Sequence, residues 1–120
     1  MFVHIFGPKV PVATEFREKV IAGVVARLRL ADPLRAIVFG SYADGNATAD
    51  SDLDVLVICR DAGDIKIVRK RIYENLKKPF APVPIDFIFI AKDEYEILRT
   101  VGGVCMVAHE QGFSIYEATA

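Results

Sequence analysis

Residues 39–58, which read FGSYADGNATADSDLDVLVI, constrain this chain most, because Asp52 and Asp54 stand two positions apart at the start of an apolar run. Side chains at positions i and i+2 of a β-strand point to the same face, so the two carboxylates should project together, followed by Leu56 and Ile58. Adjacent carboxylates repel each other, and a hard divalent cation such as Mg²⁺ is the simplest group to lie between them. The pair therefore predicts a strand that begins at a metal site.

A Gly-Ser corner precedes this pair, at the end of the apolar strand expected over residues 34–39. Gly40 has no Cβ and allows close approach, while the Ser41 hydroxyl and neighbouring backbone N–H groups can hold phosphate oxygens. Residues 42–50 are rich in turn formers, and we expect one helical turn after Ser41. The sequence thus predicts that a phosphate group and a metal ion meet here.

The order Gly-Ser, Gly45 and Ser51-Asp52-x-Asp54, followed by apolar residues, resembles the signature of the DNA polymerase β-like nucleotidyltransferase superfamily. The resemblance covers residues 35–90, and the small chain is similar to the minimal, MNT-type members. It implies an α/β (α+β) fold like the nucleotidyltransferase palm, with a small mixed β-sheet flanked by helices. Many proteins of this type resemble antitoxins paired with a HEPN-domain toxin, so the resemblance also implies a HEPN protein as partner.

In this superfamily a nucleoside monophosphate moves from an NTP to an acceptor hydroxyl, and pyrophosphate leaves. By motif position, the resemblance implies that Asp52 and Asp54 hold two Mg²⁺ ions. It also implies that Asp86 binds the metal at the attacking hydroxyl and helps to remove its proton. ATP is the expected NTP. The residues implied to bind the nucleotide are Gly40, Ser41, Gly45 and Ser51.

Asp86 is the one acid within the third expected strand, residues 85–90. An unpaired carboxylate among Ile and Phe side chains is costly to bury, so a metal-ligand role is favoured over that of a hydrogen-bonded Asp at a sheet end. Asp86 can join Asp52 and Asp54 only if the first two strands are antiparallel and the second and third are parallel. A parallel pair needs a crossover, which a helix over residues 64–78 supplies.

Helical periodicity and turn signals predict the remaining elements. Thr14 is expected to cap a first helix that stops at Asp32-Pro33, and Asp64 to cap the crossover helix, whose buried stripe ends at Leu76. Further helices are expected over residues 92–100 and 104–110, with a final strand over residues 113–117. The basic side chains of the crossover helix predict a solvated face, and phosphate or partner binding is the alternative. These side chains are Lys66, Arg69, Lys70, Arg71, Lys77 and Lys78.

Composition limits what can surround this site. At 120 residues the chain is expected to be one domain, residues 1–120, and 15 basic against 16 acidic residues predict no general attraction for nucleic acid or membranes. A hydrophobic content of 52% predicts a surface covered by a partner or by a second copy in a homo-oligomer. Without a membrane-length apolar run or a signal peptide the expected location is cytoplasmic, and Cys59 and Cys105 are expected to be reduced, buried thiols.

Asp44 departs from the family pattern, because many relatives have a basic residue immediately before the second glycine. An acid there repels triphosphate unless it points away or meets a metal. Three functions therefore compete. They are an active nucleotidyltransferase that modifies a hydroxyl on a protein partner, a weak or inactive antitoxin that masks its partner's surface, and a phospho-acceptor domain, which leaves Gly40 and Ser41 unexplained.

Overall fold

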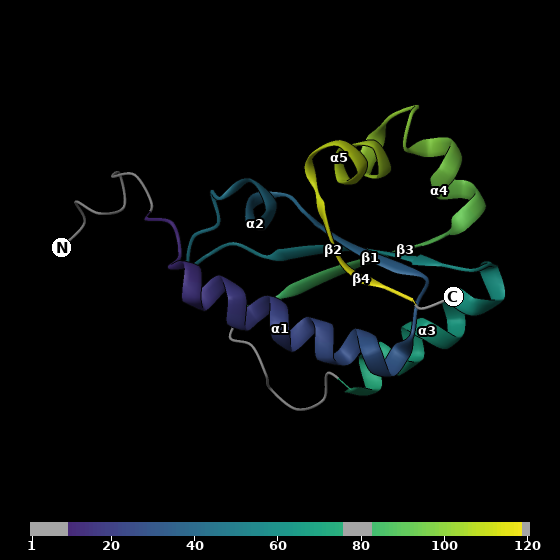
Figure 1. Cartoon of the computed structure of the whole chain (residues 1–120), viewed down its shortest axis with the longest axis horizontal. Helices are drawn as coiled ribbons and strands as arrows, with labels where there is room; N and C mark the ends of the chain where they lie inside the picture. Colours follow the sequence, from purple (N-terminus) through teal and green to yellow (C-terminus); the bar gives the residue numbers. More distant parts are fainter. Residues whose placement is uncertain (1–9, 76–82, 119–120) are drawn as a thin grey trace.

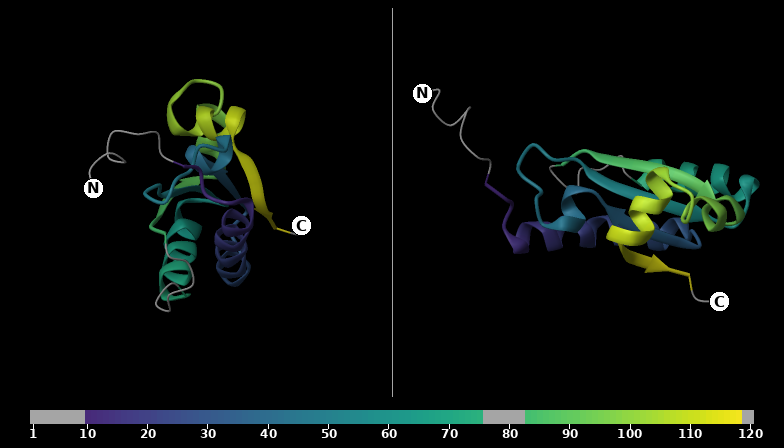
Figure 2. Two further views of the ribbon diagram at one scale, coloured as in Figure 1. Left: turned by 90° about the vertical axis from the view of Figure 1, so that its left-hand side faces the viewer. Right: turned by 90° about the horizontal axis from the view of Figure 1, so that it is seen from above.

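A computed structural model of the chain describes residues 10–75 and 83–118. A four-stranded sheet in the order β3-β2-β1-β4 lies between two helical layers, with α1 and α3 on one face and α4 and α5 on the other (Figures 1 and 2). This mixed sheet flanked by helices confirms the expected fold class. The elements are α1 (Thr14–Ala31), β1 (Arg35–Phe39), α2 (Ser41–Asp44), β2 (Leu53–Cys59), α3 (Ala62–Asn75), β3 (Ile85–Ala91), α4 (Lys92–Leu98), α5 (Gly103–Gln111) and β4 (Phe113–Glu117).

The strand directions are those that the acidic residues require. β1 pairs with β2 and with β4 in antiparallel fashion, while β2 and β3 are parallel. Helix α3 makes the crossover between the two parallel strands, as predicted. The end of β1 and the beginnings of β2 and β3 consequently share one edge of the sheet, on the side of α2 in Figure 1.

Strand β2 is buried on both faces, which explains its nearly continuous apolar sequence. Val55 and Val57 belong to the core that α1 and α3 cover, whereas Leu56 and Ile58 pack in the second core with Tyr95 of α4. The alternation also fixes the orientation of the residues at the start of the strand. Asp54 shares the face of Leu56 and Ile58, as expected from its spacing.

The two long helices begin differently from the sequence prediction, which was wrong about both caps. Thr14 already lies within α1, and the preceding Ala13 provides no side-chain cap. Asp64 lies inside α3, where its carboxylate accepts a hydrogen bond from the Arg60 amide at 2.9 Å. The Asp61 carboxylate accepts from the Asp64 amide at 2.8 Å, so Asp61 is the cap, because it precedes the first turn.

Burial of the apolar residues follows the predicted pattern. Val68 and Ile72 of α3 are buried, while Leu76 lies outside the described residues. Cys59 and Cys105 are buried and free, as expected, and burial raises the pKa of Cys59 to about 12.

Across residues 10–75 and 83–118, the helices are too short or too polar to cross a membrane.

The basic side chains of α3 that the structure describes are exposed, as the solvated-face interpretation predicts. Arg69 also lies over the ring of Phe89, with its guanidinium carbon 5.7 Å from the ring centroid. Lys77 and Lys78 lie outside the described residues. The exposed members are Lys66, Arg69, Lys70 and Arg71.

We predict that Gly112→Ala destabilises the fold by about 1–3 kcal/mol, because overpacking at a closely packed position costs this much. Gly112 follows α5, and a Cβ there would lie 2.5 Å from the Ala108 carbonyl oxygen, 2.7 Å from Ile37 Cγ2 and 2.7 Å from the Val38 carbonyl oxygen. Two of these atoms belong to the backbone and cannot move aside. Urea unfolding of both proteins measures the difference.

Gly63→Ala is the matched control. Its Cβ would meet only the Asp61 carboxylate at 3.4 Å, and alanine is favoured over glycine in a helix, so α3 should gain up to about 1 kcal/mol. Equal stability of the Gly112→Ala variant and the parent protein would contradict the described packing between α5 and β1.

Candidate active site

Asp54 and Asp86 lie opposite each other on neighbouring strands. The parallel register of β2 and β3 pairs Asp54 with Asp86, and the antiparallel register of β1 and β2 pairs Phe39 with Asp54. Because paired residues of parallel strands point to the same face, the two carboxylates project from the same side of the sheet. Asp52 is exposed and lies just before β2, two positions from Asp54.

The pKa of the Asp54 carboxyl is raised above its usual value. Its partial burial is the largest cause, and the negative charges of Asp86 and then of Asp52 add to the shift. Within the described residues, none of these three carboxylates has a hydrogen bond or an ion pair that offsets the repulsion. The structure therefore gathers three acids within electrostatic range of one another.

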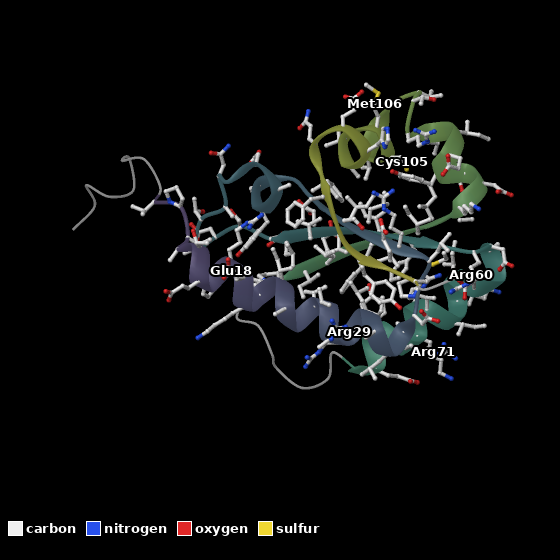
Figure 3. The ribbon with its side chains drawn as sticks, viewed as in Figure 1. Glu18, Arg29, Arg60, Arg71, Cys105 and Met106 are labelled. Carbon is white, nitrogen blue, oxygen red and sulfur yellow. The ribbon has the colours of Figure 1, made fainter. Side chains whose placement is uncertain are left out.

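Three arginines lie away from the acidic edge of the sheet. Arg29, Arg60 and Arg71 lie toward the end of the molecule remote from α2 (Figure 3). Arg60 pairs there with the carboxylates of Asp32, at 3.7 Å, and Asp64, at 3.4 Å. The charge of Arg60 is therefore balanced by carboxylates other than Asp52, Asp54 and Asp86.

Gly40 fits directly against the Asp54 carboxylate. Its backbone has a φ of 75°, in the region that favours glycine, and a Cβ at this position would lie 2.5 Å from Asp54 Oδ2. The next residue, Ser41, begins α2 and is half-buried. The predicted Gly-Ser corner therefore lies beside the predicted metal ligand, and no larger residue could replace Gly40 without displacing the acid.

The loop between α2 and β2 is held by its own polar groups. Gly45 ends α2 in the left-handed conformation, with a φ of 83°, as the predicted turn requires. The Ser51 hydroxyl accepts a hydrogen bond from the Thr48 amide at 2.8 Å, and the Ser51 amide donates to the Thr48 carbonyl at 3.0 Å. In the described structure Ser51 therefore shapes the loop that delivers Asp52; its expected contact with nucleotide stays a prediction.

Asp86 is exposed, which corrects the premise that its carboxylate would be buried among apolar side chains. The reason is its position: β3 is an edge strand, and Asp86 is the second residue of that strand. The predicted cost of burying an unpaired charge does not arise. Its proximity to Asp54 depends on strand register alone.

Asp44, the departure from the family pattern, is exposed at the end of α2. Its Oδ1 accepts a hydrogen bond from the Asn46 amide at 3.0 Å, which closes a short turn after the helix. The carboxylate thus has a local structural role.

The acids suit a divalent metal by their chemistry. Carboxylate oxygens are the ligands that Mg²⁺ prefers, and mutual repulsion among three unpaired acids is relieved by a cation. Across residues 10–75 and 83–118, however, no group of three or more His, Cys, Asp or Glu side chains is arranged to hold a metal ion.

Arg17 of α1 contacts helix α2, which follows directly after Gly40, and the sequence did not indicate this contact. Its Nε donates a hydrogen bond to the Tyr42 carbonyl of α2 at 2.9 Å, and its guanidinium carbon lies 5.0 Å from the centroid of the Phe113 ring. No motif around Arg17 signals this contact, because both partners are distant in the sequence and meet it only in the fold.

Two solved structures share the fold. A toxin-antitoxin crystallised with AMP-PNP is similar with a TM-score of 0.51 and 19% identity, over 82% of this chain and 73% of that one. A candidate nucleotidyltransferase from Sulfolobus solfataricus has a TM-score of 0.55 and 13% identity, over 86% of this chain and 85% of its own. At these identities the likeness concerns the fold alone.

Sequence comparison with families gives a more specific result. No curated protein sequence matches the chain. Residues 18–106, well over half of the chain, match the nucleotidyltransferase domain family. This match includes the Gly40-Ser41 corner and all three acids, and it confirms the resemblance inferred from the motif. The chain therefore belongs to the nucleotidyltransferase domain family, and its enzyme class is that of a nucleotidyltransferase.

Proposed function

We propose that this protein transfers a nucleoside monophosphate, AMP from ATP, to a hydroxyl group of a protein partner. The convergence of Asp54 and Asp86 on paired strands, with Asp52 close enough to raise the pKa of Asp54, is the observation that carries this proposal. Three acids that repel one another weaken a fold unless they serve a ligand. A Mg²⁺–nucleotide complex is the ligand that suits both the acids and the family.

In this proposal the three acids bind the metal, and magnesium, when bound, supplies positive charge that neutralises the phosphate oxygens. Asp52 and Asp54 contribute carboxylate oxygens from the beginning of β2. Gly40 leaves room for the Asp54 carboxylate, while the backbone and hydroxyl of Ser41 position the β- and γ-phosphates. Gly45 permits the left-handed turn that ends α2, before the loop that leads to Asp52.

In this proposal Asp86 accepts the proton of the attacking hydroxyl. In the transfer, the acceptor oxygen forms a bond to the α-phosphorus, the bond from that phosphorus to the bridging oxygen of pyrophosphate breaks, and the hydroxyl proton passes to the Asp86 carboxylate. Its exposure on an edge strand lets a group on a large molecule approach. This geometry favours a macromolecular acceptor over a small enclosed one.

We further propose that the acceptor is a toxin of the HEPN class and that the protein acts as its antitoxin. A toxin-antitoxin with AMP-PNP shares the fold, and the sequence resembles minimal nucleotidyltransferases of such pairs. A toxin side-chain hydroxyl would serve as the nucleophile.

A second candidate function is neutralisation by masking, without transfer. The observation in its favour is an exposed set of apolar side chains on α4, α5 and their connection, a surface that a partner could cover. Asp44 also favours it, because an acid beside the Gly-Ser corner disfavours triphosphate. The exposed residues are Ile97 at 65%, Val101 at 71%, Val104 at 40% and Val107 at 39%.

We predict that label is transferred to the partner protein, taken as the product of the adjacent reading frame, when it is incubated with this protein, Mg²⁺ and α-labelled ATP. Asp54→Asn and Asp86→Asn should each lower the initial rate on the order of 10²-fold, because each removes a charge that positions the reacting groups. Asp93→Asn, which alters an exposed acid of α4, is the matched control and should retain the parent rate. Scintillation counting of the partner band measures transfer.

Labels on different phosphates distinguish the alternatives. γ-Labelled ATP should leave the partner unlabelled. Tight binding of the partner without α-label would overturn transfer and support masking, whereas γ-label on this chain would support a phospho-acceptor function.

We also predict that Asp54→Asn raises the melting temperature in EDTA at neutral pH by about 2–6 °C, because it removes like-charge repulsion and the cost of burying a charge. The raised pKa of Asp54 sets the pH dependence. The folded state of the parent protein holds this proton more tightly than the unfolded state, so the contribution to stability is present at acid pH and is lost as pH rises through the folded pKa.

The advantage of the variant should therefore shrink as pH falls below the usual carboxyl range. Asp93→Asn should show no comparable gain. Adding Mg²⁺ with ATP should stabilise the parent protein and leave Asp54→Asn unchanged. A lower melting temperature for Asp54→Asn in EDTA at neutral pH would show that the acidic edge is not strained by its charges. Differential scanning fluorimetry provides each value.

A further inference from the structure

Helix α2 cannot hold its shape by local interactions alone. It contains four residues, Ser41–Asp44, whereas isolated helices shorter than about 12 residues are marginal in water. The Gly40 carbonyl accepts hydrogen bonds from the amides of Ala43, at 2.9 Å, and Asp44, at 3.2 Å. Because the Gly40-Ser41 corner opens this single turn, its geometry depends on what fixes the turn from outside.

The Tyr42 side chain supplies one external anchor. It is fully buried in the core that α1 shares with the sheet. Its backbone carbonyl lies at the end of the turn, where helices leave acceptors unused. The Asn46 amide bonds to Ser41 and not to Tyr42, so within the described residues the Tyr42 carbonyl has a single partner, the Nε of Arg17 at 2.9 Å.

Arg17 is well suited to fix this carbonyl. A hydrogen bond from a charged donor is stronger than one between neutral groups. The Arg17 side chain is half-buried. Its guanidinium carbon lies 5.0 Å from the centroid of the Phe113 ring, so this ring also holds the guanidinium in place. A continuous set of contacts therefore runs from β4, through Arg17 of α1, to the turn that carries Gly40 and Ser41.

We infer that Arg17 is a positioning residue, which holds α2 in the conformation that receives the triphosphate of the nucleotide. It acts through the Tyr42 carbonyl and not by touching the reacting atoms. The inference deepens the proposed function and rests on it for the identity of the ligand. Without Arg17 the turn would be ordered only part of the time, and nucleotide binding would have to select that ordered fraction.

Hydrogen–deuterium exchange tests the structural part without any nucleotide. In Arg17→Ala the α2 amides that are hydrogen-bonded in the described structure, Ala43 and Asp44, should exchange about tenfold faster. The amide of Ile37, in central strand β1, is the internal control and should keep its rate. Arg17→Lys, which retains charge and a donor, should recover part of the protection. Unchanged exchange at Ala43 and Asp44 in Arg17→Ala would overturn the inference, as would equal acceleration at Ile37.

Nucleotide affinity tests the functional part. By calorimetry with MgATP, Arg17→Ala should bind about tenfold more weakly, whereas transfer at saturating ATP should stay within about threefold of the parent rate. Lys19→Ala, an exposed change on the same helix, is the matched control and should bind as the parent does.

The experiments distinguish failure of the proposed nucleotide-dependent function from failure of the positioning role of Arg17. If the parent protein does not bind MgATP, the proposed function is wrong, and the exchange data still decide whether Arg17 orders α2. If the parent protein binds and Arg17→Ala binds equally well, Arg17 has no positioning role.

Discussion

Repulsion between carboxylates on adjacent strands is the constraint around which this molecule is built. Asp54 and Asp86 are fixed opposite each other by backbone register, so their proximity does not depend on attraction between their side chains. Burial and the two neighbouring charges raise the pKa of Asp54, which means that its ionised form is disfavoured in the absence of a cation. A fold that maintains such an arrangement gains from a positive ligand at this edge, and the family to which the chain belongs handles metal-bound nucleotides.

The rest of the structure supplies the energy that keeps the acids in place. Strands β1 and β2 occupy the centre of the sheet, and two apolar cores cover their faces, so their register is strongly specified. The α3 crossover makes β3 parallel to β2 and thereby brings Asp86 to the edge where β2 begins. Gly40 then closes the site, since only a residue without Cβ fits against the Asp54 carboxylate.

Much of this arrangement could be predicted from the sequence, because the informative signals are local. The position of Asp54 at the start of an apolar run predicted that it shares the face of Leu56 and Ile58, and the requirement that Asp86 join it predicted the strand directions. Sequence reasoning failed where tertiary position decides. Asp86 was expected to be buried because its neighbours are apolar, yet an edge strand exposes it. The contact of Arg17 with the Tyr42 carbonyl could not be predicted, since a backbone acceptor 25 residues away leaves no trace in the pattern of residue types.

The most direct test of the account is the position of the metal. Crystals grown with Mn²⁺ and AMP-PNP would locate the ion by its anomalous scattering, independently of any activity. The account predicts a peak about 2.1 Å from carboxylate oxygens of Asp54 and at least one of its two acidic neighbours, with the nucleotide phosphates beside Gly40 and Ser41. Nucleotide bound with its metal elsewhere on the molecule, or bound at this edge with the Asp86 carboxylate turned away and no ion at Asp54, would contradict it.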